Sequence, residues 1–340
     1  MTTASTKRHI LISGAGIAGL TTALCLSRQG FKVDVFEKAG ALDPIGAGIQ
    51  LSPNAYRILS SLGMDETLRQ ASVFPDRITI HSGRSGKTVN IIPLGETIRH
   101  RFGFPYCVIH RGDLQKLLLD HCQKTSSINL HFAATISEFE DTGEMIHAQI
   151  SGKSRKQGNA LVVADGVWSE LRGKLGMPEP EYSGKVAWRA LLSAESLSDQ
   201  ALLDGTHLWL APKSHAVTYP VQNSNLLNII VITDGIPEHE LAHLGTSQPY
   251  QETWFDNFGE NLAGAINKAD QWTAWPIFQT PEPLKLSSGN VAIMGDAAHA
   301  MLPFAAQGAA MAIEDAAVLA NCLSTHPVRA GIERFEHQRI

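Results

Sequence analysis

Residues 9–37 read HILISGAGIAGLTTALCLSRQGFKVDVFE and decide the fold of the N-terminal part of the chain. Apolar residues run through His9–Ser13 and Lys32–Glu37, which predicts two buried strands. Between them, the glycine turn GAGIAG is followed by Leu20–Gln29, whose apolar residues recur at helical spacing. The stretch therefore predicts a strand, a glycine turn, a helix and a second strand, which together form a βαβ unit.

The glycine turn has the spacing GxGxxG, formed by Gly14, Gly16 and Gly19. Glycine permits a tight turn and lets backbone N–H groups and a helix N-terminus approach a pyrophosphate. Glu37 ends the second strand, in the position from which a carboxylate accepts hydrogen bonds from an adenosine ribose. Because the strand, the helix and the acidic residue all accompany the glycines, the motif predicts a dinucleotide site.

Composition and charge exclude several classes of protein. The 340 residues are 44% hydrophobic and 18% charged, which is enough apolar material for two moderate domains. A formal net charge of −5 argues against nucleic acid as a partner. Cys25, Cys107, Cys122 and Cys322 form no CxxC pair, which argues against a disulfide framework, a thiol redox pair and a metal site. The N-terminus lacks a signal-peptide core and no stretch has the length of a membrane span, so we expect an unanchored cytoplasmic protein.

The middle of the chain alternates between helical and strand patterns. Helices are predicted over Asn54–Leu62, which ends at Gly63, and over Arg111–Gln123, where leucine recurs at helical spacing. Between Val73 and Leu94, short alternating runs around the turn SGRSGK predict a β-hairpin that belongs to another layer. Leu161–Asp165 then returns as a buried apolar strand.

The second half predicts a sheet followed by a return to the first domain. From about Tyr182 to Ile277 the chain is rich in strand patterns such as HAVTYPV and LLNIIVIT. The doubly wound pattern resumes at Asn290, and an alanine-rich helix is predicted from near Gln307 to about Leu323. The helical pattern IERFEHQRI continues to the last residue, which leaves C-terminal truncation open.

These patterns predict an α/β fold of mixed α+β character, in which a Rossmann-like cofactor domain carries an inserted β-sheet substrate domain. The cofactor domain is expected over residues 1–72, 100–178 and 285–340, and the substrate domain over residues 73–99 and 179–284.

Two further motifs decide which dinucleotide is expected. ADGVWSELR contains Asp165 and Arg172, and GNVAIMGDAAHAMLP contains Gly295 and Asp296. Together with ISGAGIAGL, and with Arg111 in IHRGDLQKLL, these motifs resemble the signatures of the flavoprotein aromatic hydroxylases, the family of p-hydroxybenzoate and salicylate hydroxylases. The resemblance covers the whole chain in the expected order, and it implies a p-hydroxybenzoate-hydroxylase-like fold with FAD as the cofactor.

The resemblance also implies roles for the motif residues. Asp165 and Arg172 are expected on the pyrophosphate side of FAD, with a part in binding the nicotinamide cofactor. Asp296, after Gly295, is expected to hold a ribityl hydroxyl, and Arg111 is expected to contact the flavin cofactor.

Three further features are expected around the flavin. The helix that begins near Gly308 would direct its N-terminal N–H groups and positive dipole end toward the flavin ring. The segment GAGIQLSPNA, residues 46–55, resembles the family segment beside the isoalloxazine ring. His299 is expected to orient the cofactor turn rather than to act in catalysis.

The remainder of the sequence limits the type of flavoenzyme. No second GxGxxG follows and no CxxC pair is present, so a nicotinamide cofactor is expected to bind only transiently. By resemblance, NADH or NADPH would reduce FAD, and O₂ would form a flavin C4a-hydroperoxide that hydroxylates a small phenolic or aromatic acid. The expected partners are therefore a small aromatic substrate, molecular oxygen and NAD(P)H, and a homodimer is compatible with the sequence.

Deprotonation of a phenol raises the nucleophilicity of its ring, and histidine is the natural base near neutral pH. His215 in APKSHAVTYPV resembles a histidine that contacts substrate in 3-hydroxybenzoate and 6-hydroxynicotinate hydroxylases, and it is the leading candidate for the catalytic base. Gln307 resembles the glutamine that accompanies this histidine in the 3-hydroxybenzoate enzyme. Phe304 stands where the 6-hydroxynicotinate enzymes carry a histidine, which favours a more apolar ring pocket.

Other residues have two interpretations. Arg189 either clamps a substrate carboxylate through two parallel hydrogen bonds or forms a surface pair. Four aromatic residues either line a substrate pocket or pack in the core: Trp188, Trp209, Tyr219 and Phe278.

Two alternative functions stay open at this point. The same motifs occur in FAD monooxygenases that modify larger polycyclic or quinone-like metabolites. A protein that binds FAD without turnover is the non-enzymatic alternative.

Overall fold

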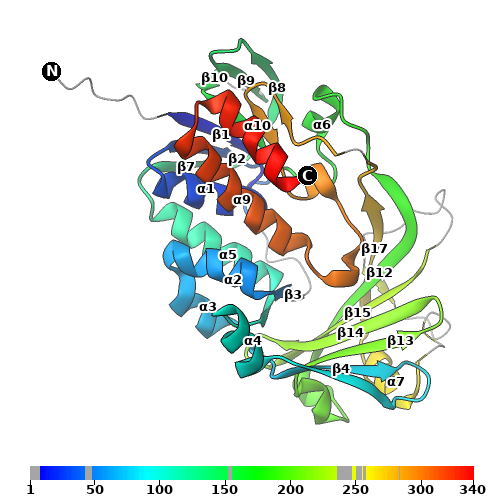
Figure 1. Ribbon diagram of the computed structural model, residues 1–340. Helices are drawn as coiled ribbons and strands as arrows, with labels where there is room; N and C mark the ends of the chain where they lie inside the picture. Colours follow the sequence, from blue (N-terminus) through cyan, green and yellow to red (C-terminus); the bar gives the residue numbers. More distant parts are fainter. Residues whose placement is uncertain are drawn as a thin grey trace.

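The computed structural model describes residues 8–42, 48–151, 155–235, 247–249, 255, 258–282 and 284–340. Figure 1 shows a helical half at the upper left and a large curved sheet at the lower right.

A six-stranded sheet forms the core of the helical half. Its strand order is β18–β19–β11–β1–β2–β7, and all neighbours are parallel except β18, which pairs antiparallel at the edge. The central strands are apolar on both faces, as is typical of parallel strands covered on both sides; in β1 (His9–Ser13), residues 10–12 are fully buried. The other strands are β2 (Lys32–Phe36), β7 (Ile128–His131), β11 (Ala160–Val163), β18 (Ser287–Ser288) and β19 (Val291–Ile293).

Helices and a small sheet cover the six-stranded sheet. Helix α1 (Ile17–Arg28) packs between α9 (Gly308–Thr325) and α5 (Arg111–Gln123), and α10 (Val328–Arg339) packs on α9. A three-stranded antiparallel sheet contacts β1; it contains β8 (Ile136–Asp141), β9 (Ile146–Ile150) and β10 (Arg155–Gly158). The predicted βαβ unit and the α5 helix are confirmed.

One predicted helix ends earlier than expected. The regular helix α2 (Pro53–Leu59) is followed by a wider turn over Ser60–Met64, in which Gly63 has a φ of 86°. The left-handed conformation of this glycine breaks the helix before α3 (Asp65–Ala71) begins.

The second half of the molecule is an eight-stranded sheet with the order β16–β17–β12–β15–β14–β13–β4–β5. Its long central strands are β12 (Glu181–Ser193), β13 (Thr206–Ala211), β14 (Ser214–Val221), β15 (Leu226–Asp234) and β17 (Gln271–Gln279), with β16 (Ser247–Pro249) at one edge. The hairpin β4 (Arg77–Ser82) and β5 (Thr88–Pro93) forms the other edge, since β4 pairs in parallel with β13. Helix α7 (Glu260–Ile266) contributes buried residues to the core on one face of this sheet.

Two elements connect the halves. The strands β3 (Gly48–Leu51) and β6 (Cys107–His110) form a two-stranded sheet, and an added Cβ at Gly48 would lie 2.3 Å from the ring of Tyr219 on β14. The hairpin leads into α4 (Gly95–Phe102), so the domain boundary expected between residues 99 and 100 falls inside a helix. The predicted α/β fold with a sheet-based second part is confirmed, whereas the expected domain boundaries stay a prediction.

Candidate functional site

A cavity of about 690 Å³ is lined by residues from both halves of the molecule. The loops that follow β1, β2 and β11 contribute Gly14, Glu37 and Asp165, as expected for a ligand at the carboxyl ends of parallel strands. Of the twelve residues predicted from sequence to bind cofactor or catalyse, eight line this cavity: Gly14, Gly16, Glu37, Arg111, Asp165, His215, Asp296 and Gly308.

The glycine turn forms one end of the cavity. Gly14 has a φ of 99°, and a Cβ there would lie 2.4 Å from the carbonyl oxygen of Ala164. A Cβ on Gly16 would meet no atom within 4 Å, which leaves open space directly before α1. Gly19 has a different role, because it packs closely against the carbonyl oxygen of Gly14. An added Cβ at Gly19 would lie only 1.9 Å from that oxygen.

The carboxylate of Glu37 fixes the backbone around this turn. It accepts hydrogen bonds from the N–H of Ala15 at 2.8 Å and from the N–H of Ala39 at 2.9 Å. Gln115, one helical turn after Arg111 on α5, also lines the cavity and donates to the carbonyl of Ala15 at 3.0 Å. Gln115 was not among the residues expected from the sequence, although its i, i+4 spacing from Arg111 was the available signal.

The two residues of the ADGVWSELR motif take different positions. Asp165 lines the cavity; it accepts a hydrogen bond from Ser13 Oγ at 3.3 Å, and its buried Oδ1 has no partner among the described residues. Arg172 is fully buried in α6 (Glu170–Lys174) and lies outside the cavity lining. Its guanidinium donates to the carbonyls of Ala297, at 3.0 Å, and Val167, so it connects this motif to the one around Asp296.

The turn before the short helix α8 (Asp296–His299) carries the next part of the site. Asp296 lines the cavity, whereas Gly295 lies behind it with a φ of 57°, where its N–H donates to Asp315 Oδ2 at 3.0 Å. Gly308 and Ala309 line the cavity at the start of α9, which has no side-chain cap. The first turns of α1 and α9 therefore both present uncapped N–H groups near this space.

Strand alternation decides which side chains of the large sheet reach the cavity. Residues 215, 217 and 219 of β14 and residues 187 and 189 of β12 line it. Trp188 lies between residues 187 and 189 of β12, and Trp209 follows the cavity-lining Leu208 on β13, so both side chains pack in the core on the far face. Phe278 lies outside the cavity lining, with its ring 4.7 Å from that of Trp168, so Tyr219 is the predicted aromatic residue that reaches the cavity.

His215 and Arg189 are the two basic side chains that the described strands of the large sheet present to the cavity, beside the phenol of Tyr219. The His215 ring lies 5.5 Å from the ring of Phe304, and burial lowers the pKa of its imidazole. Burial also lowers the pKa of the Arg189 guanidinium, whose Nε is buried without a partner among the described residues. The charges of Tyr219, Arg111 and Asp296 also influence the pKa of this guanidinium, which therefore lies near the cofactor motifs.

Gln307 lies outside the cavity lining. Its side-chain amide donates to Ser52 Oγ at 2.6 Å and to the carbonyl of Ala305 at 3.3 Å, so it connects the start of α9 to the start of α2. The segment 46–55 borders the cavity through Gly48, Ile49 and Gln50, while Gly46 and Ala47 lie outside the described residues.

The part of the chain that the structure describes contains neither a candidate metal cluster nor a membrane-spanning helix. Its histidine, cysteine and acidic residues include no group of three that could hold a metal ion. Among its helices, none combines the length and the apolar character that a membrane span requires.

The protein family described as "FAD binding domain" matches residues 7–336. The chain belongs to this family of FAD-dependent monooxygenases. It is 36% identical to 3-hydroxybenzoate 6-hydroxylase 1 of Aquipseudomonas alcaligenes, over 92% of this chain and 79% of that protein. It is 30% identical to 6-hydroxynicotinate 3-monooxygenase of Pseudomonas fluorescens, over 94% of this chain and 83% of that protein.

A solved structure agrees with this assignment. Klebsiella pneumoniae HpxO complexed with FAD and uric acid has a TM-score of 0.84 and 25% identity to this flavoprotein, over 98% of this chain and 84% of that chain. The predicted FAD cofactor and the monooxygenase class are confirmed.

The residues of the cavity fit FAD. A pyrophosphate suits the open space at Gly16, because the uncapped N–H groups at the start of α1 provide donors and a positive dipole end. The partnerless Oδ1 of Asp165 is a buried acceptor that needs a donor. The uncapped N–H groups and positive dipole end at the start of α9 would likewise stabilise negative charge on the cofactor, at the part of the cavity that Asp296 lines.

Proposed function

We propose that this flavoprotein hydroxylates a small phenolic or aromatic acid, with NADH or NADPH as the electron donor and O₂ as the source of oxygen. The observation that carries the proposal is that His215 and Arg189 line the same cavity as the FAD motifs. A base and a buried cation are the two groups that a phenolic carboxylate requires. The 36% identity to a 3-hydroxybenzoate 6-hydroxylase supports the same substrate class.

FAD, when bound, supplies electron transfer from the nicotinamide and the activation of O₂. His215 accepts the phenolic proton, which increases the electron density of the substrate ring. Arg189 holds the substrate carboxylate, since an unpaired guanidinium N–H in a buried site favours an anion. Apolar side chains of the sheet exclude water around the ring: Leu208, Val217, Ile230 and Ile232.

We propose the cofactor roles of the motif residues as follows. Gly14 and Gly16 receive the pyrophosphate, Asp296 holds a ribityl hydroxyl, and Arg111 contacts the flavin. Three other motif residues support the cofactor loops without lining the cavity: Arg172, Gly19 and Gly295. Gln307 acts in the same indirect way through Ser52.

A larger polycyclic or quinone-like substrate is the second candidate. The cavity favours a single ring, because its volume of about 690 Å³ extends from the glycine turn to the large sheet and must hold part of FAD as well.

The proposal is tested by anaerobic mixing of the FAD-loaded protein with NADH or NADPH, with and without a panel of aromatic compounds. We expect flavin reduction to accelerate with 3-hydroxybenzoate, salicylate or a related hydroxy acid, and to change little with bulky quinone-like phenols. Acceleration by the bulky compounds alone would favour the second candidate. A flavin that neither nicotinamide reduces would support an FAD-binding protein without turnover.

Arg189→Gln is expected to raise the KM for a hydroxybenzoate by roughly 10- to 100-fold, because a hydrogen bond to a charged group is worth about 1.5–3 kcal/mol. The KM for the matching neutral hydroxybenzamide should change little, since it lacks the carboxylate. Steady-state kinetics on both compounds measure the difference. Equal losses for acid and amide would show that Arg189 does not bind the carboxylate.

We also propose that the protein acts in the cytoplasm, where its four buried free cysteines would stay reduced. The expected homodimer is tested by light scattering of the FAD-loaded protein. For the domain division, we propose that the hairpin of residues 77–93 belongs with the substrate domain because β4 pairs with β13.

A further inference from the structure

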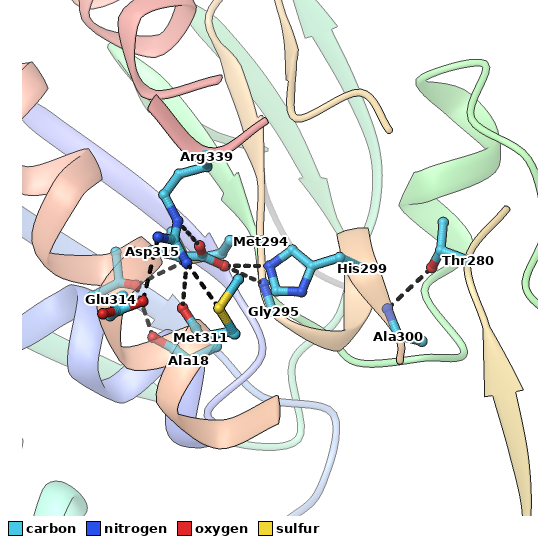
Figure 2. A network of polar contacts seen from close by, with 11 residues as sticks. Ala18, Thr280, Met294, Gly295, His299, Ala300, Met311, Glu314, Asp315 and Arg339 are labelled. Atoms are coloured by element: carbon cyan, nitrogen blue, oxygen red, sulfur yellow. Dashed lines mark hydrogen bonds and ion pairs between the residues drawn. The ribbon is translucent and has the colours of Figure 1, made fainter. Parts of the chain in front are cut away.

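A fully buried carboxylate lies directly behind the turn that carries Asp296. Asp315, on α9, accepts three hydrogen bonds: from the N–H of Gly295 at 3.0 Å, from His299 Nε2 at 2.5 Å, and from Arg339 Nε at 2.7 Å. Figure 2 shows Asp315 between the imidazole of His299 and the guanidinium of Arg339. Asp315 does not line the cavity, so any effect on the cofactor passes through its partners.

Arg339 brings the last turn of α10 into this network. Its guanidinium also donates to the carbonyl of Met311 at 3.3 Å and pairs with Glu314 at 3.4 Å, and only 13% of its side chain is exposed. One side chain of α10 thus contacts three residues along the cofactor-proximal turns of α9 (Figure 2).

The turn that carries Asp296 is held on both sides of Gly295, whose carbonyl also accepts hydrogen bonds from the N–H groups of Ala298 and His299. Gly295 has a φ of 57° and a ψ of −150°, a conformation that depends on glycine. The N–H of this residue is the group bonded to Asp315, and the next residue is Asp296. Because Gly295 directly precedes Asp296, we expect a change in the position or charge of Asp315 to shift the direction in which Asp296 faces the cavity.

Charge balance in the network depends on Arg339. Burial alone would raise the pKa of Asp315, but the hydrogen bond and charge of His299, the Gly295 N–H and Arg339 lower it, so the carboxylate is ionised at neutral pH. Burial would lower the pKa of His299, but Asp315 and, more weakly, Asp296 raise it. Without Arg339, His299 would be the remaining cation beside a buried carboxylate, and Glu314 would lose its ion pair while it kept the hydrogen bond from Asn54 Nδ2.

We propose that Asp315 and Arg339 are positioning residues that hold the Gly295 turn and His299 in the geometry required for FAD binding. The inference rests on the proposed contact of Asp296 with FAD. It adds that α10, through Arg339, is part of the cofactor site.

The test compares FAD affinity in apoprotein variants by titration of flavin fluorescence, without substrate or nicotinamide. Arg339→Gln and Asp315→Asn are each expected to raise the Kd for FAD roughly tenfold, the scale on which residues without ligand contact alter binding. Arg339→Lys should restore part of the affinity, because it keeps the charge but loses the fork that reaches Met311.

A second readout separates positioning from general stability. In Arg339→Gln, only protonated His299 balances Asp315, so FAD affinity should fall as pH rises through the pKa of His299. The parent protein should show a flat profile between about pH 6 and 9, because Arg339 stays charged throughout.

Glu336→Gln is the matched control on the same helix. Glu336 accepts hydrogen bonds from the N–H groups of Leu286, at 2.7 Å, and Ser287, at 3.2 Å, and in the part of the chain that the structure describes it makes no hydrogen bond or ion pair with the Gly295 turn. This variant is expected to lower the Tm while leaving the Kd for FAD within about twofold.

The proposal is overturned if Arg339→Gln lowers the Tm but keeps the parental Kd and flat pH profile, or if Glu336→Gln weakens FAD binding to the same extent. Failure of the proposed hydroxylase function would leave these outcomes unchanged, because the titration contains neither substrate nor electron donor.

Discussion

Replacement of His215 by alanine is expected to lower the rate of substrate hydroxylation by roughly 10²- to 10⁴-fold, the usual contribution of a general base. FAD should remain bound, because the side chain lies on the sheet wall of the cavity, away from the glycine turn. The measurement is substrate-dependent NAD(P)H oxidation together with product formation. Full activity in the variant would remove His215 from the mechanism.

The pH dependence gives a second signature of the same residue. Burial, with a smaller contribution from Lys185, holds the pKa of His215 below its ordinary value of 6.5, so the imidazole is a neutral acceptor at pH 7. The kcat/KM of the parent should therefore fall only as pH drops below this lowered pKa, where the base becomes protonated. This acid limb should be absent from the residual activity of His215→Ala.

His207→Gln is the matched control for a histidine on the same sheet. His207 lies on β13, and its Nδ1 lies 3.0 Å from Nε2 of His81, while its neighbours Thr206 and Leu208 line the cavity. We expect this variant to lose stability but to keep the acid limb. An acid limb that disappears in His207→Gln and persists in His215→Ala would reverse the assignment.

Two glycine substitutions in the GxGxxG motif are expected to differ in their effect on the apoprotein, because only one of them conflicts with neighbouring atoms. Gly19→Ala places a Cβ 1.9 Å from the carbonyl oxygen of Gly14, so α1 must move off the turn. We expect a loss of about 3 kcal/mol or more in the free energy of unfolding, at the upper end for an overpacked site. FAD binding should be lost with the fold.

Gly16→Ala has no such conflict within the protein. Gly16 has a φ of −73°, which alanine adopts readily, and its Cβ would meet no atom within 4 Å. The Tm of the apoprotein should stay close to that of the parent, while FAD affinity falls by roughly tenfold or more, because the methyl group occupies space that the pyrophosphate requires.

Calorimetry of both apoproteins, followed by FAD titration of Gly16→Ala, measures these effects. A Gly16→Ala variant with parental FAD affinity would place the pyrophosphate elsewhere. A Gly19→Ala variant with the parental unfolding temperature would contradict the close packing between α1 and the turn.

Much of the glycine-turn end of the cavity could be predicted from the sequence. Strand, glycine turn and helix are contiguous in residues 9–37, so their geometry is set by local spacing, and Gly14, Gly16 and Glu37 reach the cavity as expected. The motifs around Asp165 and Asp296 reach it for the same reason, because each follows a strand of one parallel sheet.

Which side chains of the large sheet reach the cavity depends on long-range packing and could not be predicted from the sequence. The alternating pattern of a strand shows which residues share one face of the sheet. Which of the two faces lines the cavity depends on how the strands pair and on what packs against each face. Arg189 therefore lines the cavity while its neighbour Trp188 packs in the opposite core.

The supporting residues also lay beyond sequence reasoning. Asp315 and Arg339 are separated along the chain by the end of α9 and the whole of α10, and their contact depends on how these two helices pack. Arg172 and Gln307 stand in the predicted motifs but direct their polar groups at other loops. Motif spacing fixes where a residue lies along the backbone, whereas the direction of a long side chain is fixed by the groups that surround it after folding.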